Sequence, residues 1–401
     1  MLMPDYATYK SIFSGIPMPF AFVDLDLLDR NIRDIAKAVG SKKIRVASKS
    51  IRSVDVLRRI LRSNSVFQGV MCYTAVEAAF LARQGFQDLL LGYPTWDPQG
   101  VLPLIDLIGE GHVITFMVDS IAHVEQLERL ASERGVRVPL CLDVDMSASY
   151  PGLRFGVWRS PVDCWTAARP VVERIRSSAW VYLDGLMGYE AQIAGVGDNV
   201  PGQTLKNAVV RYLKRRSIRD VATRRAEVVE GIRELGLPPL RFVNAGGTGS
   251  LATSREEKVV TELTAGSGFY SPLLFDNYGS FRYLPAAGFA VEVVRRPRTD
   301  IVTCMGGGYT ASGAADGTKL PRPYLPAGLS LFSLEGAGEV QTPLLIGKEA
   351  VEARMELGDP VFFRHAKAGE LCERFDRLYA IEGGALVDEY MTYRGMGETF
   401  L

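Results

Sequence analysis

The chain has 401 residues, 47% of them hydrophobic and 23% charged, a composition typical of a globular protein long enough for two domains. Lys and Arg together number 46, as do Asp and Glu, so the net charge is zero and neither a nucleic acid nor an anionic membrane is an expected partner. We find no apolar run of membrane-spanning length and no signal-peptide pattern, and the five cysteines are scattered without metal-type spacing, so we expect a cytoplasmic protein.

Predicted strands and helices alternate along the first two thirds of the chain. Each of eight β-type runs is followed by a segment with helical character. The predicted strands cover residues 20–25, 43–49, 66–71, 89–92, 113–118, 138–144, 180–186 and 240–244. Eight parallel βα units in about 250 residues are typical of a (β/α)8 TIM barrel. The alternative, a doubly wound open sheet, would place a glycine-rich turn after the first strand, where this chain has Asp24-Leu25-Asp26.

The pattern changes after about Tyr278, where helical periodicity fades. Short β-type runs then alternate with glycine- and proline-rich turns, which indicates a mostly-β domain. We predict a barrel over residues 19–275 and a β domain over residues 276–401 together with 1–18. The segment 305–328 is predicted to be a long loop, and loops of that length are often functional.

Lys49 ends the second predicted strand. At the carboxyl end of a barrel strand, a lysine lies on the rim where ligands bind. Partial desolvation there lowers the pKa of its ammonium and makes it a nucleophile able to form a Schiff base. A solvent-exposed lysine at the end of a strand is the alternative, and the predicted barrel favours the functional interpretation.

A glycine-rich stretch, Asn244-Ala-Gly-Gly-Thr-Gly-Ser250, follows the last predicted strand. Its glycines allow the backbone to approach an anion, and its N–H groups and hydroxyls suit a phosphate. The loops after the last two strands of a barrel are a usual phosphate site. The alternative is a glycine-rich turn without a ligand. Ser267 and Gly268, a short distance further on, are candidates for the same phosphate.

Four polar residues are expected near the barrel mouth. Asp143 and Asp145 end a predicted strand, and Arg154 follows in the next loop. Arg154 suits a substrate carboxylate or a phenolate oxygen, although a pair with one of the two aspartates explains it equally well. Tyr189 ends a further strand, where it could stack on a ring, or it is a tyrosine of the core.

His365, Glu370 and Cys372 lie near the carboxyl terminus and have side chains that suit a metal ion. Their spacing is not diagnostic of a metal site. A histidine at the surface or between domains, satisfied by hydrogen bonds, is the favoured interpretation of His365.

In their order and spacing these motifs resemble the fold-type III pyridoxal-phosphate (PLP) enzymes, the alanine-racemase-like barrels, and among them relatives of D-threonine aldolase and D-serine dehydratase. The likeness covers most of the chain, from Val23-Asp-Leu-Asp26 to the C-terminal β domain. It implies that Lys49 carries the cofactor as an internal aldimine. It implies further that the phosphate is held by Gly246, Gly247, Thr248, Ser267 and Gly268, and that the cofactor ring is contacted by Arg154 and Tyr189.

One motif departs from this family. The aldolase and dehydratase relatives bind a divalent metal through His-x-Cys or His-x-Asp near the carboxyl terminus. This chain has His365-Ala-Lys367 at that place, with Glu370 and Cys372 slightly further on. A divalent metal held by His365 and Cys372 would therefore deviate from the family pattern.

The resemblance implies a lyase that acts on a D- or achiral β-hydroxy-α-amino acid, by retro-aldol cleavage or dehydration, through a Schiff base on Lys49. The alternative is an amino-acid racemase in which Tyr309 supplies the second base. A PLP-binding homeostasis protein is a third class, but those proteins are usually a barrel alone. The resemblance also implies a head-to-tail homodimer, in which Tyr309 and Asp316 are the candidates to cross into the partner's site.

Overall fold

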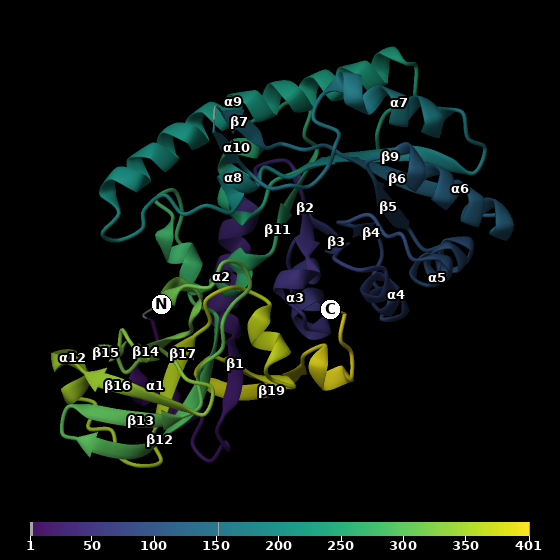
Figure 1. Cartoon of the computed structure of the whole chain (residues 1–401). Helices are drawn as coiled ribbons and strands as arrows, with labels where there is room; N and C mark the ends of the chain where they lie inside the picture. Colours follow the sequence, from purple (N-terminus) through teal and green to yellow (C-terminus); the bar gives the residue numbers. More distant parts are fainter. Residues whose placement is uncertain (1–2, 151, 401) are drawn as a thin grey trace.

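The computed structural model describes residues 3–150 and 152–400, which form a closed parallel barrel and a mostly antiparallel sheet (Figure 1). The eight barrel strands are neighbours in the order β10-β11-β2-β3-β4-β5-β6-β9. Their bounds are β2 (Lys43–Ala47), β3 (Phe67–Cys72), β4 (Leu89–Leu91), β5 (Ile114–Val118), β6 (Val138–Asp143), β9 (Val181–Gly188), β10 (Phe242–Ala245) and β11 (Glu262–Ala265). The expected TIM barrel with a separate mostly-β region is confirmed, and the doubly wound alternative is excluded because the sheet closes.

Helices surround the barrel, and the longest, α9, lies across one side of it (Figure 1). The main helices are α2 (Leu25–Ala38), α3 (Val54–Ser63), α4 (Ala75–Arg83), α5 (Pro98–Gly109), α6 (Ile121–Arg134), α7 (Trp165–Arg176) and α9 (Thr204–Glu234). Shorter elements of this part are α8 (Ala191–Ala194), α10 (Leu251–Ser254), α11 (Ser267–Tyr270) and the hairpin of β7 (Ala148–Tyr150) and β8 (Leu153–Phe155). Several helices begin at a side chain that accepts a hydrogen bond from the first turn; Asp24 does so for α2, Thr74 for α4 and Ser120 for α6.

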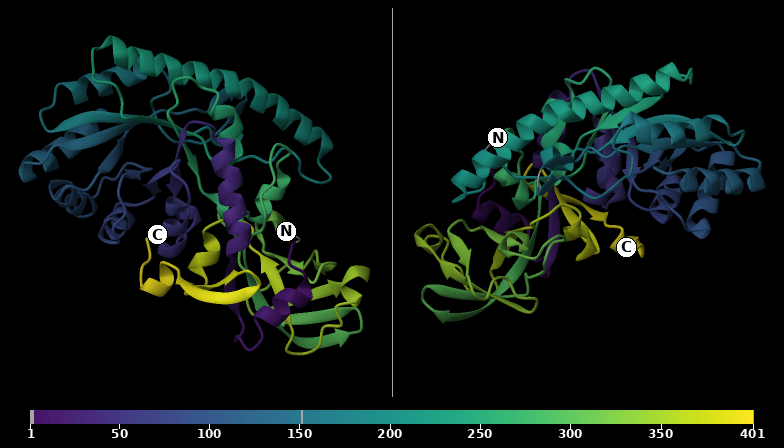
Figure 2. Two further views of the ribbon diagram at one scale, coloured as in Figure 1. Left: turned by 180° about the vertical axis from the view of Figure 1, so that it is seen from behind. Right: turned by 45° about the horizontal axis from the view of Figure 1, so that its top comes forward.

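The second sheet has nine strands and lies below the barrel in Figure 1. Its strands are β1 (Phe20–Asp24), β12 (Ala287–Arg298), β13 (Ile301–Met305), β14 (Arg322–Leu325), β15 (Leu329–Leu331), β16 (Gln341–Ile346), β17 (Pro360–Arg364), β18 (Arg377–Glu382) and β19 (Ala385–Met391). The short helices α1 (Tyr6–Ile12) and α12 (Lys348–Val351) accompany it. Helix α2 leads from this sheet to the barrel, as the left view in Figure 2 shows. The expected boundary near residue 275 stays a prediction.

The strand expected at 20–25 is not part of the barrel. It is β1, which pairs with β12 and β18 in the second sheet. Phe20 and Phe22 join an aromatic cluster on one face, while Ala21 and Val23 belong to the main core on the other. A strand buried on both faces has the same apolar pattern in either sheet, so the sequence alone could not assign it.

The eighth barrel strand is β11 (Glu262–Ala265), which the sequence did not predict as a strand. Its polar side chains face partners within the barrel rather than solvent. Glu262 Oε1 accepts hydrogen bonds from Arg45 Nε at 2.7 Å and Asn244 Nδ2 at 2.8 Å, and Thr264 Oγ1 donates to Asn244 at 3.0 Å. Buried charges are tolerated when they are paired in this way, and such a strand lacks the apolar run expected of a parallel sheet.

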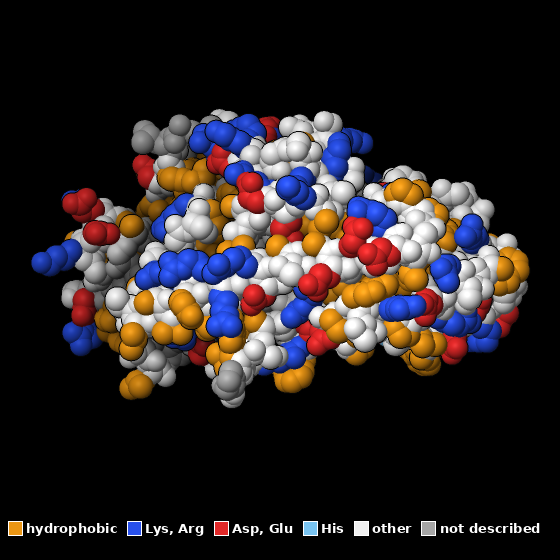
Figure 3. All heavy atoms as spheres, turned by 90° about the horizontal axis from the view of Figure 1, so that it is seen from above, with side chains coloured by type: hydrophobic (Ala, Val, Ile, Leu, Met, Phe, Trp, Pro, Cys, Tyr) orange, Lys and Arg blue, Asp and Glu red, His pale blue; other side chains and the backbone are white. Residues whose placement is uncertain are grey.

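The face over α9, shown in Figure 3, carries Lys and Arg side chains beside Asp and Glu, with hydrophobic side chains between them. Charge of both signs is therefore spread over this face. Within the part of the chain that the structure describes, no helix combines the length and the apolarity needed to span a bilayer.

Candidate active site

Lys49 lies directly after β2, at the carboxyl end of that barrel strand, in the short 3-10 turn Ser48–Ser50. Its Nζ is 3.3 Å from the hydroxyl of Tyr93, which follows β4 at the same end of the barrel. The placement expected for Lys49, on the rim where ligands bind, is thus the one that the structure has. The amine and the phenol form a pair able to exchange a proton.

Arg159 is the second cation beside Tyr93, at 4.7 Å from the centre of the ring. It is held by Asp143, whose Oδ2 accepts from Arg159 Nε at 2.7 Å, and by the carbonyl of Gly92. Burial raises the pKa of Asp143 to about 6, although Arg159 opposes the shift. Desolvation raises the pKa of Tyr93, but Lys49 and Arg159 outweigh it and leave that pKa below its ordinary value. Sequence reasoning missed both Tyr93 and Arg159.

Two glycine-rich loops meet beside the lysine turn, one after β10 and one after β11. Thr248 Oγ1 accepts from the backbone N–H of Gly268 at 3.2 Å, and the hydroxyls of Ser267 and Ser50 are 3.2 Å apart. A Cβ at Gly268 would lie 2.6 Å from Thr248 Cγ2, and one at Gly247 would lie 3.1 Å from the Tyr189 ring. The predicted phosphate residues therefore come together with the lysine turn, in a cradle that side chains would fill. This arrangement fits the phosphate of PLP.

Glu190 fixes the first of these loops, a role that the sequence did not reveal. Its carboxylate is fully buried and accepts from the Gly246 N–H at 3.2 Å and the Ser250 hydroxyl at 2.8 Å. Arg225, on α9, donates to it at 3.0 Å and is fully buried as well. Because both charges are paired inside the protein, the loop is tied to the long helix.

Tyr189 and Arg154 have different surroundings. Tyr189 lies against the Gly247 loop, and burial together with Glu190 raises its pKa to about 12, so it is a neutral phenol at pH 7. Arg154 forms the ion pair with Asp145 that was its alternative interpretation, and its guanidinium lies 4.0 Å from the centre of the Trp158 ring. The contact of either residue with a cofactor ring stays a prediction.

The predicted metal ligands, His365 and Cys372, are both buried. No group of three or more His, Cys, Asp or Glu side chains suited to a metal occurs among the described residues. Burial raises the pKa of the Cys372 thiol to about 12, and its sulfur contacts the carbonyl of Ile51 at 3.3 Å. Tyr270 donates to the same carbonyl and packs edge-on against His365. A metal held by His365 and Cys372 stays a prediction, and we assign no step to it.

The second sheet reaches the lysine turn through the loop after β17. Gly369 has φ +89°, and a Cβ there would lie 2.0 Å from the Lys49 carbonyl oxygen. The same carbonyl accepts from Arg52 Nε at 2.9 Å, and Arg52 is paired at 2.5 Å with Glu373. The chain's own C-terminal region therefore supports the backbone of Lys49.

Tyr309 packs within its own chain, against Phe289 and under the guanidinium of Arg374 at 5.2 Å. Asp316 is exposed in a loop, where it accepts from the Thr318 N–H. Their predicted crossing to a partner stays a prediction.

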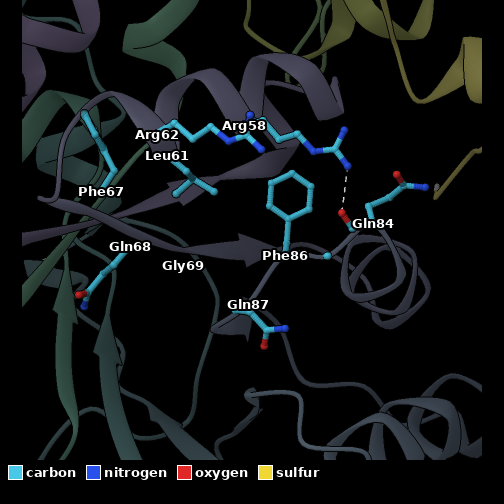
Figure 4. Close-up of a pocket in the computed structure, with 10 residues that line it drawn as sticks. Arg58, Leu61, Arg62, Phe67, Gln68, Gly69, Gln84, Phe86 and Gln87 are labelled. Carbon is cyan, nitrogen blue, oxygen red and sulfur yellow. Dashed lines mark hydrogen bonds between the residues drawn. The ribbon is translucent and has the colours of Figure 1, made fainter.

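A cavity of about 520 Å³ lies at the opposite end of the barrel (Figure 4). Phe67, at the start of β3, lines it, and so do Phe86 and Arg58, which donates to the Gln84 carbonyl at 3.0 Å. Because ligands of these barrels bind at the carboxyl ends of the strands, this cavity is not the candidate active site.

A model of the alanine racemase N-terminal domain matches residues 23–271. The chain belongs to this family. A comparison with curated proteins found no match.

Three solved structures illustrate the likeness of this alanine-racemase-like chain. D-threonine aldolase from Filomicrobium marinum has a TM-score of 0.80 at 17% identity, over 96% of each chain. D-threo-3-hydroxyaspartate dehydratase from Delftia sp. HT23 has a TM-score of 0.74 at 18% identity, over 97% of this chain and 99% of that one. An alanine-racemase-like protein from Idiomarina loihiensis has a TM-score of 0.72 at 14% identity, over 98% and 99%. At these identities the comparisons establish the fold alone.

Proposed function

We propose that the protein is a PLP-dependent lyase acting on a D- or achiral β-hydroxy-α-amino acid, by retro-aldol cleavage or dehydration. The observation that carries the proposal is the contact between the Lys49 turn and the glycine cradle, made through Ser50 and Ser267. A lysine amine and a phosphate cradle side by side, in a barrel of this family, are the two attachment points that PLP requires. The likeness to an aldolase and a dehydratase supports the reaction class.

PLP, when bound, supplies a conjugated electron sink for negative charge that develops on the substrate. In this chain, Lys49 would hold it covalently through Nζ, while the N–H groups and hydroxyls of the cradle bind its phosphate. Glu190 keeps the cradle in shape by accepting from the Gly246 N–H. Tyr189 is a neutral phenol beside the cradle and would cover one side of the ring.

Tyr93 is our candidate for proton transfer. Its hydroxyl is 3.3 Å from Lys49 Nζ, and the two cations beside it favour its deprotonated form. A phenolate oxygen at that position accepts a proton from the Lys49 ammonium or from the β-hydroxyl of a substrate, and returns it later in the cycle. Both retro-aldol cleavage and dehydration need such a group.

The racemase alternative requires a second base, for which Tyr309 was the candidate. Burial raises the pKa of the Tyr309 phenol well above its ordinary value, and Glu370 adds to that shift. A phenol in this environment is a poor base at neutral pH. We therefore favour the lyase.

A substrate panel tests the proposal. The purified protein, supplied with PLP, is incubated with D- and L-β-hydroxy amino acids. An aldehyde with glycine identifies an aldolase, a 2-oxo acid with ammonia identifies a dehydratase, and an epimer identifies a racemase. Borohydride reduction followed by peptide mapping should place the cofactor on Lys49. Cofactor attached to a different lysine, or no product from any of these substrates, would overturn the proposal.

A further inference from the structure

Glu77, on α4, has a fully buried carboxylate. The backbone N–H of Tyr73 donates to its Oε2 at 2.8 Å, and the phenol of Tyr393 donates to its Oε1 at 3.0 Å. Within the part of the chain that the structure describes it forms no ion pair, and Arg52, the arginine whose charge acts on it, is paired with Glu373 instead. A buried carboxylate without a paired cation depends on each of its hydrogen-bond donors, so the loss of one is costly.

The C-terminal segment, residues 392–400, follows β19 and contacts the lysine turn. The N–H of Tyr393 donates to the Arg52 carbonyl at 2.9 Å, and the preceding residue forms an antiparallel bridge with Ser53. Arg52 Nε donates in turn to the Lys49 carbonyl at 2.9 Å. Two hydrogen bonds in series therefore join the C-terminal segment to the backbone of Lys49.

Arg52 has a backbone conformation that needs support from its surroundings. Its φ is +52°, in the left-handed region that residues other than glycine rarely adopt. Such a conformation costs free energy and persists where neighbouring groups fix it. The groups that do so here are the N–H of Tyr393, the carboxylate of Glu373 and the ring of Tyr73, whose centre lies 5.3 Å from the guanidinium. Because Arg52 follows Lys49 by three residues, a change in its conformation displaces the lysine turn.

An aromatic cluster fastens the C-terminal segment to α4. The ring of Phe400 lies 5.5 Å from that of Phe80 and 5.2 Å from that of Tyr393, and the rings of Phe80 and Tyr393 are 5.5 Å apart. Glu77 and Phe80 are three residues apart on α4 and so share one face of the helix. The cluster therefore places the Tyr393 hydroxyl against the Glu77 carboxylate.

We propose that Glu77 and Tyr393 are positioning residues for Lys49: the hydrogen bond between them holds the C-terminal segment against the lysine turn and so fixes the direction of the Lys49 amine. This inference rests on the proposed function, in which that amine attaches PLP. Tyr393 acts on the turn through its N–H on the Arg52 carbonyl. Glu77 also lies beside Ser48, the residue before Lys49; burial raises the pKa of Glu77 to about 7, and hydrogen bonds, the first of them from Ser48, oppose that rise.

The test follows how fast added PLP attaches to Lys49, by borohydride trapping at a series of times. Tyr393→Phe removes the hydroxyl and keeps the ring, and we expect it to slow attachment about tenfold or more. Turnover of the β-hydroxy amino acid substrate should lose kcat by a similar factor, with KM changed less than about threefold. Glu77→Gln keeps an oxygen that accepts from the Tyr393 phenol, so it should retain more of the attachment rate than Glu77→Leu.

Tyr9→Phe is the matched control, because it breaks the same kind of hydrogen bond elsewhere in the molecule. The phenol of Tyr9 donates to the buried carboxylate of Asp24 at 2.9 Å, and the N–H of Leu27 donates to the same carboxylate at 3.0 Å. Tyr9→Phe and Tyr393→Phe should therefore lower the Tm by similar amounts, whereas only Tyr393→Phe should slow the attachment of PLP.

Equal attachment rates in Tyr393→Phe and Tyr9→Phe would overturn the inference, because the bond to Glu77 would then stabilise the fold alone. Should Tyr393→Phe not fold, Glu77→Gln takes its place in this comparison. In the original protein, PLP attached to a lysine other than Lys49, or to none, would overturn the proposed function and the inference with it. Slow attachment confined to Tyr393→Phe, with no turnover of any β-hydroxy amino acid, would support the inference and overturn the lyase.

Discussion

Replacing Gly369 by alanine tests the support that the second sheet gives to Lys49. A side chain at φ +89° costs about 1–3 kcal/mol in backbone strain. In addition, the new methyl carbon would lie 2.0 Å from the Lys49 carbonyl oxygen, so the two backbones must separate by roughly 1 Å. A displacement of about 1 Å at a catalytic group can lower the rate about 100-fold. We expect Gly369→Ala to lose stability and also most of its activity.

Gly358→Ala is the matched control, because Gly358 has φ +90° and a Cβ there would have no heavy atom within 4 Å to obstruct it. Urea unfolding measures the free energy of unfolding of both variants, and borohydride trapping measures how fast PLP attaches to Lys49. Gly358→Ala should show the backbone strain alone, with normal trapping. If both variants lose the same stability and trap PLP equally well, the loop does not hold Lys49 in place and the reasoning fails.

Three further predictions concern the candidate site. Lys49→Ala should abolish turnover and borohydride trapping while the far-ultraviolet circular dichroism stays unchanged, and residual turnover near the original rate would remove Lys49 from the reaction. Tyr93→Phe should lower kcat about 100-fold; because Tyr93 acts as a base with a pKa below its ordinary value, activity of the original protein should rise with pH through that pKa, and this limb of the profile should vanish in the variant. If Tyr309→Phe is itself inactive and two chains complete each site, mixing it with Lys49→Ala should restore activity in up to about a quarter of sites, whereas no recovery despite proven subunit exchange would place Tyr309 in its own chain's site.

The barrel was largely predictable, because seven of its strands are visible as β-type runs, and the helices after β3, β4 and β5 begin with a capping side chain. Two strands were assigned wrongly. The first predicted strand, β1, lies outside the barrel, and the eighth barrel strand, β11, was not predicted. β1 is apolar on both faces, so its sequence does not distinguish one sheet from the other. β11 carries Glu262 and Thr264, whose polarity is compensated only by Arg45 and Asn244 across the closed barrel. Partners more than 15 residues away in sequence leave no local pattern.

The sequence predicted those residues of the candidate site whose type is unusual at the end of a barrel strand. A lysine at a strand end and three glycines after a late strand are visible in the sequence. Tyr93 and Arg159 were missed because only the fold brings them together. They meet when β4 and β6 take their places around the barrel. Gly369 is one of 40 glycines in the sequence, and its positive φ and close approach to Lys49 are visible only in the structure.

The position of β1 has a consequence for how the chain is made. This strand precedes the barrel strands in the chain, and its two neighbours, β12 and β18, are translated more than 260 and 350 residues after it. Until β12 and β18 are translated, the backbone N–H and C=O groups of β1 lack the strands with which they pair. Its phenylalanines likewise lack the core into which they pack. The barrel strands can close earlier, but the β1–β18 pairing and the contact of Gly369 with Lys49 come last. A fragment ending after the barrel would therefore expose β1 as an aggregation-prone edge, and it would also lack the loop that supports Lys49.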